Sequence, residues 1–106
     1  MSKNRDRLLT PRELDPELMN PKRFSIVTYL YVFGPKTMAE LVRALGLSWG
    51  DLDSNIRRLR EKGYVSTRRQ LTLKGPRVFV ELTEKGRRAY EELARRLNEI
   101  TRRVRS

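Results

Sequence analysis

The sequence predicts an α+β fold, mainly α, in the form of a winged helix-turn-helix with a long C-terminal dimerisation helix. Three observations predict it. Two short amphipathic segments meet at Gly46. Two segments rich in β-branched and aromatic residues flank the basic turn Lys74-Gly75-Pro76. A stripe of apolar residues with heptad spacing begins at Gly86. A helix-turn-helix with a β-hairpin wing presents one helix and one hairpin to nucleic acid.

The chain divides into three parts in this interpretation. Residues 1–19 form an N-terminal extension, 20–83 the winged helix-turn-helix and 84–106 the terminal helix. In the extension, Thr10-Pro11 and Asp15-Pro16 each place a capping residue before proline, which predicts short helical turns. The leucines of this extension dock either on the core of the domain or on a second subunit.

Capping residues and glycines mark the ends of the first two helices. Asn20-Pro21 starts a long helix, and Gly34-Pro35 ends it. Thr37 and Glu40 have the spacing of a capping box at the start of the second helix. Gly46 ends that helix, because glycine readily adopts positive φ.

The third helix is expected from Trp49 to about Lys62, with Ser48 as its cap and Asp51 as partner in a second capping box. Its apolar residues fall within a narrow arc, so the opposite face is polar and points outward. In a helix-turn-helix that face reads the major groove. The predicted DNA-contacting residues here are Ser48, Trp49, Gly50, Asp53, Ser54, Arg57 and Arg58. Asp53 either accepts a hydrogen bond from a cytosine amino group or keeps the first turn off the DNA.

A β-hairpin is expected after Gly63, with strands around residues 64–67 and 77–82. Val78, Val80 and Leu82 alternate with other residues, which predicts that one face of the hairpin is half buried. The basic residues predicted to lie along phosphates or in the minor groove are Arg68, Arg69, Lys74 and Arg77.

The charge supports a polyanionic partner. The net charge is +11, and residues 57–77 hold eight basic residues against one acid, a net charge of +7. A basic excess placed on the recognition helix and wing favours nucleic acid. Composition alone also fits the heavily charged surface of a thermophilic or archaeal protein.

The residue types that are absent from the sequence limit the catalytic and metal-binding chemistry that the chain can perform. There is no Cys and no His, so thiolate chemistry, the commonest general base and the commonest metal ligand are missing. With no Gly-rich phosphate loop either, the sequence predicts no enzyme, no cofactor and no metal site. The N-terminus lacks a signal-peptide core, so cytoplasmic localisation is expected.

The terminal helix, capped by Thr83, predicts self-association. From Gly86 onward, apolar residues recur at alternating intervals of four and three over almost three heptads. The first turns can pack on the domain itself, but the part beyond Leu93 outruns a domain this small. The residues expected to form a homodimer seam are Tyr90, Leu93, Leu97, Ile100 and Val104.

Over residues 20–97 the sequence resembles winged-helix regulators of the MarR/ArsR superfamily, in particular their small single-domain archaeal and bacterial group. The resemblance rests on two stretches, LVRALGLSWGDLDSNIRRLREKGYV and LKGPRVFVELTEKGRRAYEEL. The matching positions are Leu45, Leu47, Ser48, Gly50-x-Leu52, Leu59-x-x-x-Gly63-Tyr64-Val65 and Leu82-Thr83-x-x-Gly86-Arg87. The acidic Asp53 departs from the commoner polar or basic residue.

The resemblance implies a homodimer on a pseudo-palindromic operator, usually acting as a repressor. Many such relatives bind small-molecule effectors, and Tyr29, Tyr31, Phe33 and Tyr90 could line the crevice for one, although core packing explains them equally. We therefore expect a regulator that binds double-stranded DNA. The alternative is a winged-helix protein–protein interaction module of the transcription machinery, which would not need a basic wing.

Overall fold

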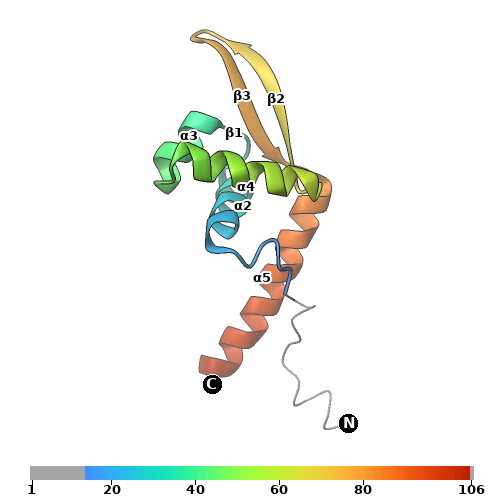
Figure 1. Cartoon of the computed structure of the whole chain (residues 1–106). Helices are drawn as coiled ribbons and strands as arrows, with labels where there is room; N and C mark the ends of the chain where they lie inside the picture. The colour runs from blue at the N-terminus through green and yellow to red at the C-terminus, as the bar shows by residue number, and fades with distance from the viewer. Residues whose placement is uncertain (1–13, 106) are drawn as a thin grey trace.

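Four helices and a three-stranded antiparallel sheet make up residues 14–105, the part of the chain that the computed structural model describes (Figure 1). In chain order the elements are α2 (Pro21–Phe33), β1 (Lys36–Thr37), α3 (Met38–Leu45), α4 (Trp49–Glu61), β2 (Val65–Thr72), β3 (Gly75–Leu82) and α5 (Glu84–Arg105). The predicted winged helix-turn-helix, mainly helical and with a long C-terminal helix, is confirmed.

The caps explain where the helices begin. The Asn20 side chain accepts hydrogen bonds from two N–H groups in the first turn of α2, and both halves of the Thr37–Glu40 capping box are present at α3. Gly46 follows α3 with φ 66°, as predicted. The second capping box was wrong: Ser48 accepts from the N–H of Asp51, but the Asp51 carboxylate bonds Lys22 instead of closing the box.

The sheet contains one strand that the sequence did not predict. Its order is β1-β3-β2, and the two-residue β1 pairs with β3 through Lys36↔Val80 and Thr37↔Phe79. Two residues are too few to show a periodicity, so this strand depends on its partner. The predicted hairpin is confirmed, but its strands are longer than the expected 64–67 and 77–82. β2 and β3 pair from Val65↔Leu82 to Thr72↔Gly75, so Arg68 and Arg69 lie in β2 and not in a loop.

The hairpin is buried only at its base. Val80 is fully buried, whereas Val78 is 39% exposed, so the half-buried face that alternation predicted does not continue to the tip. The reason is geometric. In Figure 1 the β2–β3 wing projects past α4, on the side away from the end of α5, and its outer part extends beyond the helices.

The core is built from one cluster of buried side chains contributed by every helix and by the base of the wing. Its members are Leu18, Ile26, Val27, Leu30, Leu41, Leu52, Ile56, Leu59, Tyr64, Val65, Val80 and Leu93. Leu18 belongs to the extension, so this leucine docks on the domain itself, while Met19 stays 46% exposed. Of the predicted N-terminal turns, the one at Asp15-Pro16 forms as a single non-helical turn, and Thr10-Pro11 lies outside the described residues.

The first half of α5 packs on its own domain. The Tyr90 hydroxyl bonds Thr28 of α2 at 2.9 Å, Leu93 is buried, and Gly86 lies against the backbone of Tyr64. Toward the end of the helix Val104 is 78% exposed. The heptad stripe is therefore core at its start, and its later residues extend away from the domain.

Candidate nucleic-acid interface

The structure places every predicted residue of α4 on its exposed side. Leu52, Asn55, Ile56 and Leu59 hold the other side against the core. The indole of Trp49 at the start of the helix is 55% exposed. The predicted residues that are exposed on α4 and at its cap are Ser48, Trp49, Gly50, Asp53, Ser54, Arg57 and Arg58, and Trp49 is the one large apolar side chain among them.

Each of the three arginines of α4 already has a partner within the protein. Arg57 donates to Asp53 at 2.6 Å, one turn away on the same helix. Arg58 reaches Glu17 of the N-terminal segment, and Arg60 donates to the Thr67 hydroxyl at 3.2 Å. The structure thus gives Asp53 a role that sequence reasoning missed, as an i,i+4 partner of Arg57.

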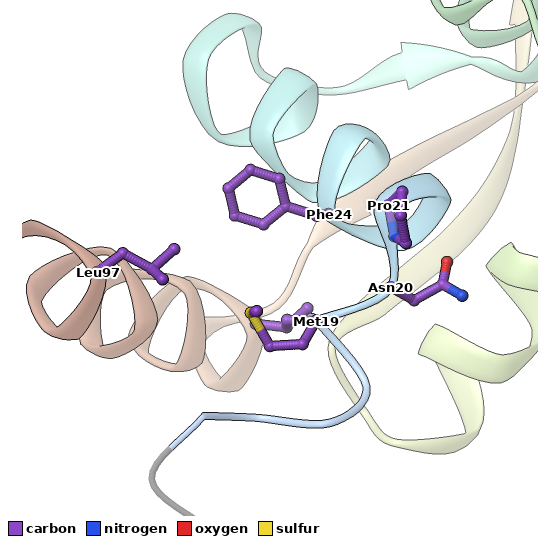
Figure 2. A pocket seen from close by; sticks show the side chains of 6 residues that line it. Met19, Asn20, Pro21, Phe24 and Leu97 are labelled. Carbon is purple, nitrogen blue, oxygen red and sulfur yellow. The ribbon is translucent and has the colours of Figure 1, made fainter. Parts of the chain in front are cut away.

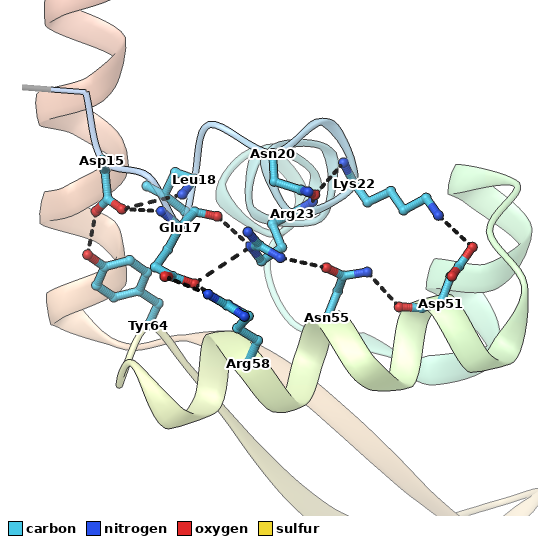
Figure 3. A network of polar contacts seen from close by, with 10 residues as sticks. All are labelled: Asp15, Glu17, Leu18, Asn20, Lys22, Arg23, Asp51, Asn55, Arg58 and Tyr64. Carbon is cyan, nitrogen blue, oxygen red and sulfur yellow. Dashed lines mark hydrogen bonds and ion pairs between the residues drawn. The ribbon is translucent and has the colours of Figure 1, made fainter. Parts of the chain in front are cut away.

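Glu17 joins the N-terminal segment to α4 (Figure 3). Its carboxylate accepts from Arg58 Nε at 2.7 Å and from Nη2 at 3.3 Å, and the residue is only 8% exposed. The hydrogen bond from Arg58 is the main reason that the pKa of Glu17 lies below its usual value, and it raises the pKa of Arg58 in turn. No periodicity or spacing in the sequence predicts this pair, because its members are 41 positions apart.

Arg23 extends the same network to α2. Its Nε donates to the Glu17 carbonyl at 2.6 Å, and its Nη1 donates to Asn55 Oδ1 at 3.0 Å. Asn55 in turn donates to the Asp51 carbonyl within α4. A second link runs from Tyr64, whose hydroxyl donates a hydrogen bond to the Asp15 carboxylate. The pKa of Tyr64 is raised, mainly because the side chain is buried and also because of this bond. The orientation of α4 is therefore fixed by polar contacts as well as by its apolar face.

Glu17→Gln is expected to lower the free energy of unfolding by about 1–2 kcal/mol at neutral pH, because a charge-assisted hydrogen bond is weakened whose carboxylate is buried and whose guanidinium is partly exposed to solvent. Because the folded pKa of Glu17 is depressed, its contribution is complete above the usual carboxyl pKa of 4.5 and is lost as the pH falls through the lowered value. The wild type and the variant should thus converge in acid.

Urea denaturation at pH 7 and at progressively lower pH measures this effect. Glu84→Gln is the matched control, since it removes an exposed i,i+4 pair with Arg88 and should cost less than about 0.5 kcal/mol. Equal losses in the two variants at neutral pH would contradict a structural role for Glu17.

The wing cations fall into two groups. Arg68 pairs with Glu81 at 3.0 Å, bonds Gln70 and lies 5.3 Å from the centre of the Phe79 ring. Arg77 donates to the carbonyl of its neighbour Pro76. The side chains of Arg69 and Lys74 are exposed and make no ion pair or hydrogen bond with any residue in 14–105. Those two are the wing cations most available to an external anion.

The predicted aromatic crevice does not form as one site. The rings of Tyr29 and Phe33 are tilted by 45° with their centres 4.6 Å apart, and both line one cavity with Val32 and Leu45. The rings of Tyr31 and Tyr90 form another tilted pair, with their centres 4.9 Å apart. The four rings therefore make two separate pairs.

Of the heptad stripe, Leu97 borders a different hollow (Figure 2). This apolar cavity of about 200 Å³ lies between α5 and the start of α2, and the residues around it are Leu18, Met19, Asn20, Pro21, Phe24 and Leu97. Tyr90 and Leu97 are half-buried and Leu93 is buried, all packed on the core, whereas Ile100 is half-buried farther along α5.

Comparison with known proteins agrees with this geometry. The family described as winged helix DNA-binding domain matches residues 22–101. A transcriptional regulator homologue from Pyrococcus horikoshii OT3 is 25% identical with a TM-score of 0.79, and the match covers 98% of both chains. None of the curated protein sequences compared with the chain matches it.

Two bacterial structures are also similar. A MarR-family putative transcriptional regulator from Enterococcus faecalis V583 is 26% identical over 84% of this chain and 80% of its own, with a TM-score of 0.75. The transcriptional repressor BigR from Xylella fastidiosa is 32% identical over 73% and 72%, with a TM-score of 0.62.

The chain belongs to the winged-helix DNA-binding family, which the helix-turn-helix and the wing define. Within it, the protein is a DNA-binding transcriptional regulator of the MarR type. Between residues 14 and 105, no helix combines the length and the apolar character needed to cross a bilayer.

Proposed function

We propose that the protein is a homodimeric repressor that binds a pseudo-palindromic operator in double-stranded DNA. In this proposal α4 lies in the major groove and the wing follows the backbone or the minor groove. The observation that carries the proposal is the outward polar face of α4 beside a wing whose Arg69 and Lys74 have no partner among the described residues. The named repressor activity of the BigR relative supports repression.

Different residues would have different tasks. Ser54 and the guanidinium groups of Arg57 and Arg58 would reach bases or phosphates from α4, with Trp49 near the backbone. Phosphate contacts would come from Arg68, Arg69, Lys74 and Arg77, because phosphates position the protein whereas base edges specify the sequence. Arg57 and Arg58 would have to exchange Asp53 and Glu17 for DNA.

The second half of α5 offers an apolar surface for the proposed homodimer interface. Ile100 and Val104 continue the heptad stripe past the residues that pack on the domain, and Val104 is 78% exposed. Pairing this half-helix with its twin would bury both residues twice, since an isologous interface duplicates every contact. It would also link two copies of α4, as two half-sites require.

DNA affinity is expected to depend steeply on salt. If a dimer neutralises about 6–10 phosphates, affinity should fall roughly 10³–10⁵-fold between 50 and 200 mM salt, because released counterions drive the binding. Fluorescence anisotropy with a duplex selected from a random pool measures it. A dimer that binds no duplex even at the lower salt concentration would support the protein–protein interaction module instead.

A further inference from the structure

We propose that the tip of the wing is an apolar wedge that enters the minor groove and bends the duplex. This inference deepens the proposed function and rests on it. None of the DNA-contacting residues considered so far is apolar apart from Trp49. The wedge would consist of Leu73 at the turn, supported by Leu71 of β2.

The tip exposes leucine where a turn usually carries small polar residues. Thr72 pairs with Gly75, so Leu73 and Lys74 form a two-residue connection between the strands. The side chain of Leu73 is fully exposed, and Leu71 is 78% exposed. An isolated apolar side chain on a surface has no special meaning, but here two exposed leucines lie two positions apart at the end of one projecting hairpin, and we call them the patch.

Leu71 continues the core-facing side of the hairpin toward the tip. Thr67 pairs with buried Val80 at the base, and the pairs two and four positions farther out, Arg69↔Val78 and Leu71↔Pro76, share that face because side chains alternate along a strand. Val78 is already 39% exposed. Beyond the edge of the domain, therefore, the hairpin presents apolar side chains next to a cation.

The charge around the patch selects its partner. Between residues 68 and 80 the chain has four basic residues and no acid. The like charges would repel a second copy of the same tip, whereas a polyanion would be attracted. Among polyanions, duplex DNA is favoured because the tip belongs to the hairpin that projects past α4, the proposed recognition helix (Figure 1).

The dimensions of the DNA grooves indicate where Leu73 would lie in the complex. With α4 in the major groove, a hairpin beside it reaches the adjacent minor groove, which is only about 6 Å wide and admits a tip rather than a flat ribbon. Leucine offers no hydrogen bond to base edges. Apolar side chains in this groove insert between base pairs, partly unstack them and kink the duplex toward the major groove by about 20–90°.

Bending can be measured by energy transfer between dyes on the two ends of a duplex selected from a random pool. Wild-type protein should increase the transfer, and Leu73→Ser should lose most of that increase while its salt dependence stays unchanged. Lys74→Ala is the matched control at the neighbouring position. It should lower the salt slope by about one per protomer and keep the bend, because it removes a phosphate contact only.

Three outcomes have separate meanings. Wild-type protein that binds no duplex would overturn the proposed function itself. Wild-type protein that binds without bending, or Leu73→Ser protein that bends DNA as well as the wild type, would overturn the wedge alone. Vesicles of phosphatidylserine and phosphatidylcholine test the rival polyanion: binding to them that requires Leu73, with DNA bending unaffected by Leu73→Ser, would assign the tip to a membrane surface instead.

Discussion

Ile100→Glu should convert the proposed dimer to a monomer and weaken binding to the proposed operator by about 10²–10⁴-fold. The twofold axis would bring two introduced carboxylates close together in the proposed α5 seam. The loss of DNA affinity follows because two half-sites need two linked recognition helices, and the linkage alone contributes about that factor. Ile100 is the better target than Leu97, since Leu97 also packs on the core of its own domain.

Analytical ultracentrifugation and duplex titration at the same protein concentration measure the two effects together. Thr101→Glu is the matched control: it introduces the same charge at the next, exposed position of α5. It should leave both the mass and the affinity nearly unchanged. A dimeric Ile100→Glu variant with normal affinity would show that dimerisation does not use this stripe.

Gly86→Ala should destabilise the fold by on the order of 3 kcal/mol. A Cβ at this position would lie 2.1 Å from the Tyr64 carbonyl oxygen, which is backbone and cannot turn aside. That carbonyl also accepts from the Thr83 N–H at 3.0 Å, so moving it would disturb the junction between the wing and α5. The gain in helix propensity from alanine, about 1 kcal/mol, is too small to compensate.

Gly50→Ala is the control, because it makes the same change in another helix where a Cβ would meet nothing within 4 Å. That variant should be as stable as the wild type or up to about 1 kcal/mol more stable. Thermal and urea unfolding compare the two. If Gly86→Ala were also neutral, α5 would have to be able to shift away from Tyr64.

Local signals in the sequence predicted most of the fold. The Thr37–Glu40 box and Gly46 depend only on residues within one turn, so their spacing was sufficient. Gly86 was counted as a member of an apolar stripe, although its function is close approach to Tyr64. Its signal was present: glycine in the first turn of an otherwise strong helix needs a packing reason.

Polar contacts between distant segments were not predictable. The Lys22–Asp51, Glu17–Arg58 and Asp15–Tyr64 contacts join residues 29, 41 and 49 positions apart, and no periodicity connects them. They matter for the candidate site, because acidic side chains of the protein itself neutralise part of the positive charge on α4. The wing tip was missed for a related reason: Leu71 and Leu73 lie between the two predicted strands and carried no prediction, and only the folded hairpin shows how exposed they are.

The ion pairs of α4 affect how strongly this helix can bind DNA in the proposed complex. Here Asp53 lies 2.6 Å from Arg57 and Glu17 lies 2.7 Å from Arg58, so each guanidinium has a carboxylate ready to receive it. In the proposed complex these two carboxylates would compete with phosphates for the guanidinium groups and would lower the affinity of α4 for DNA of any sequence.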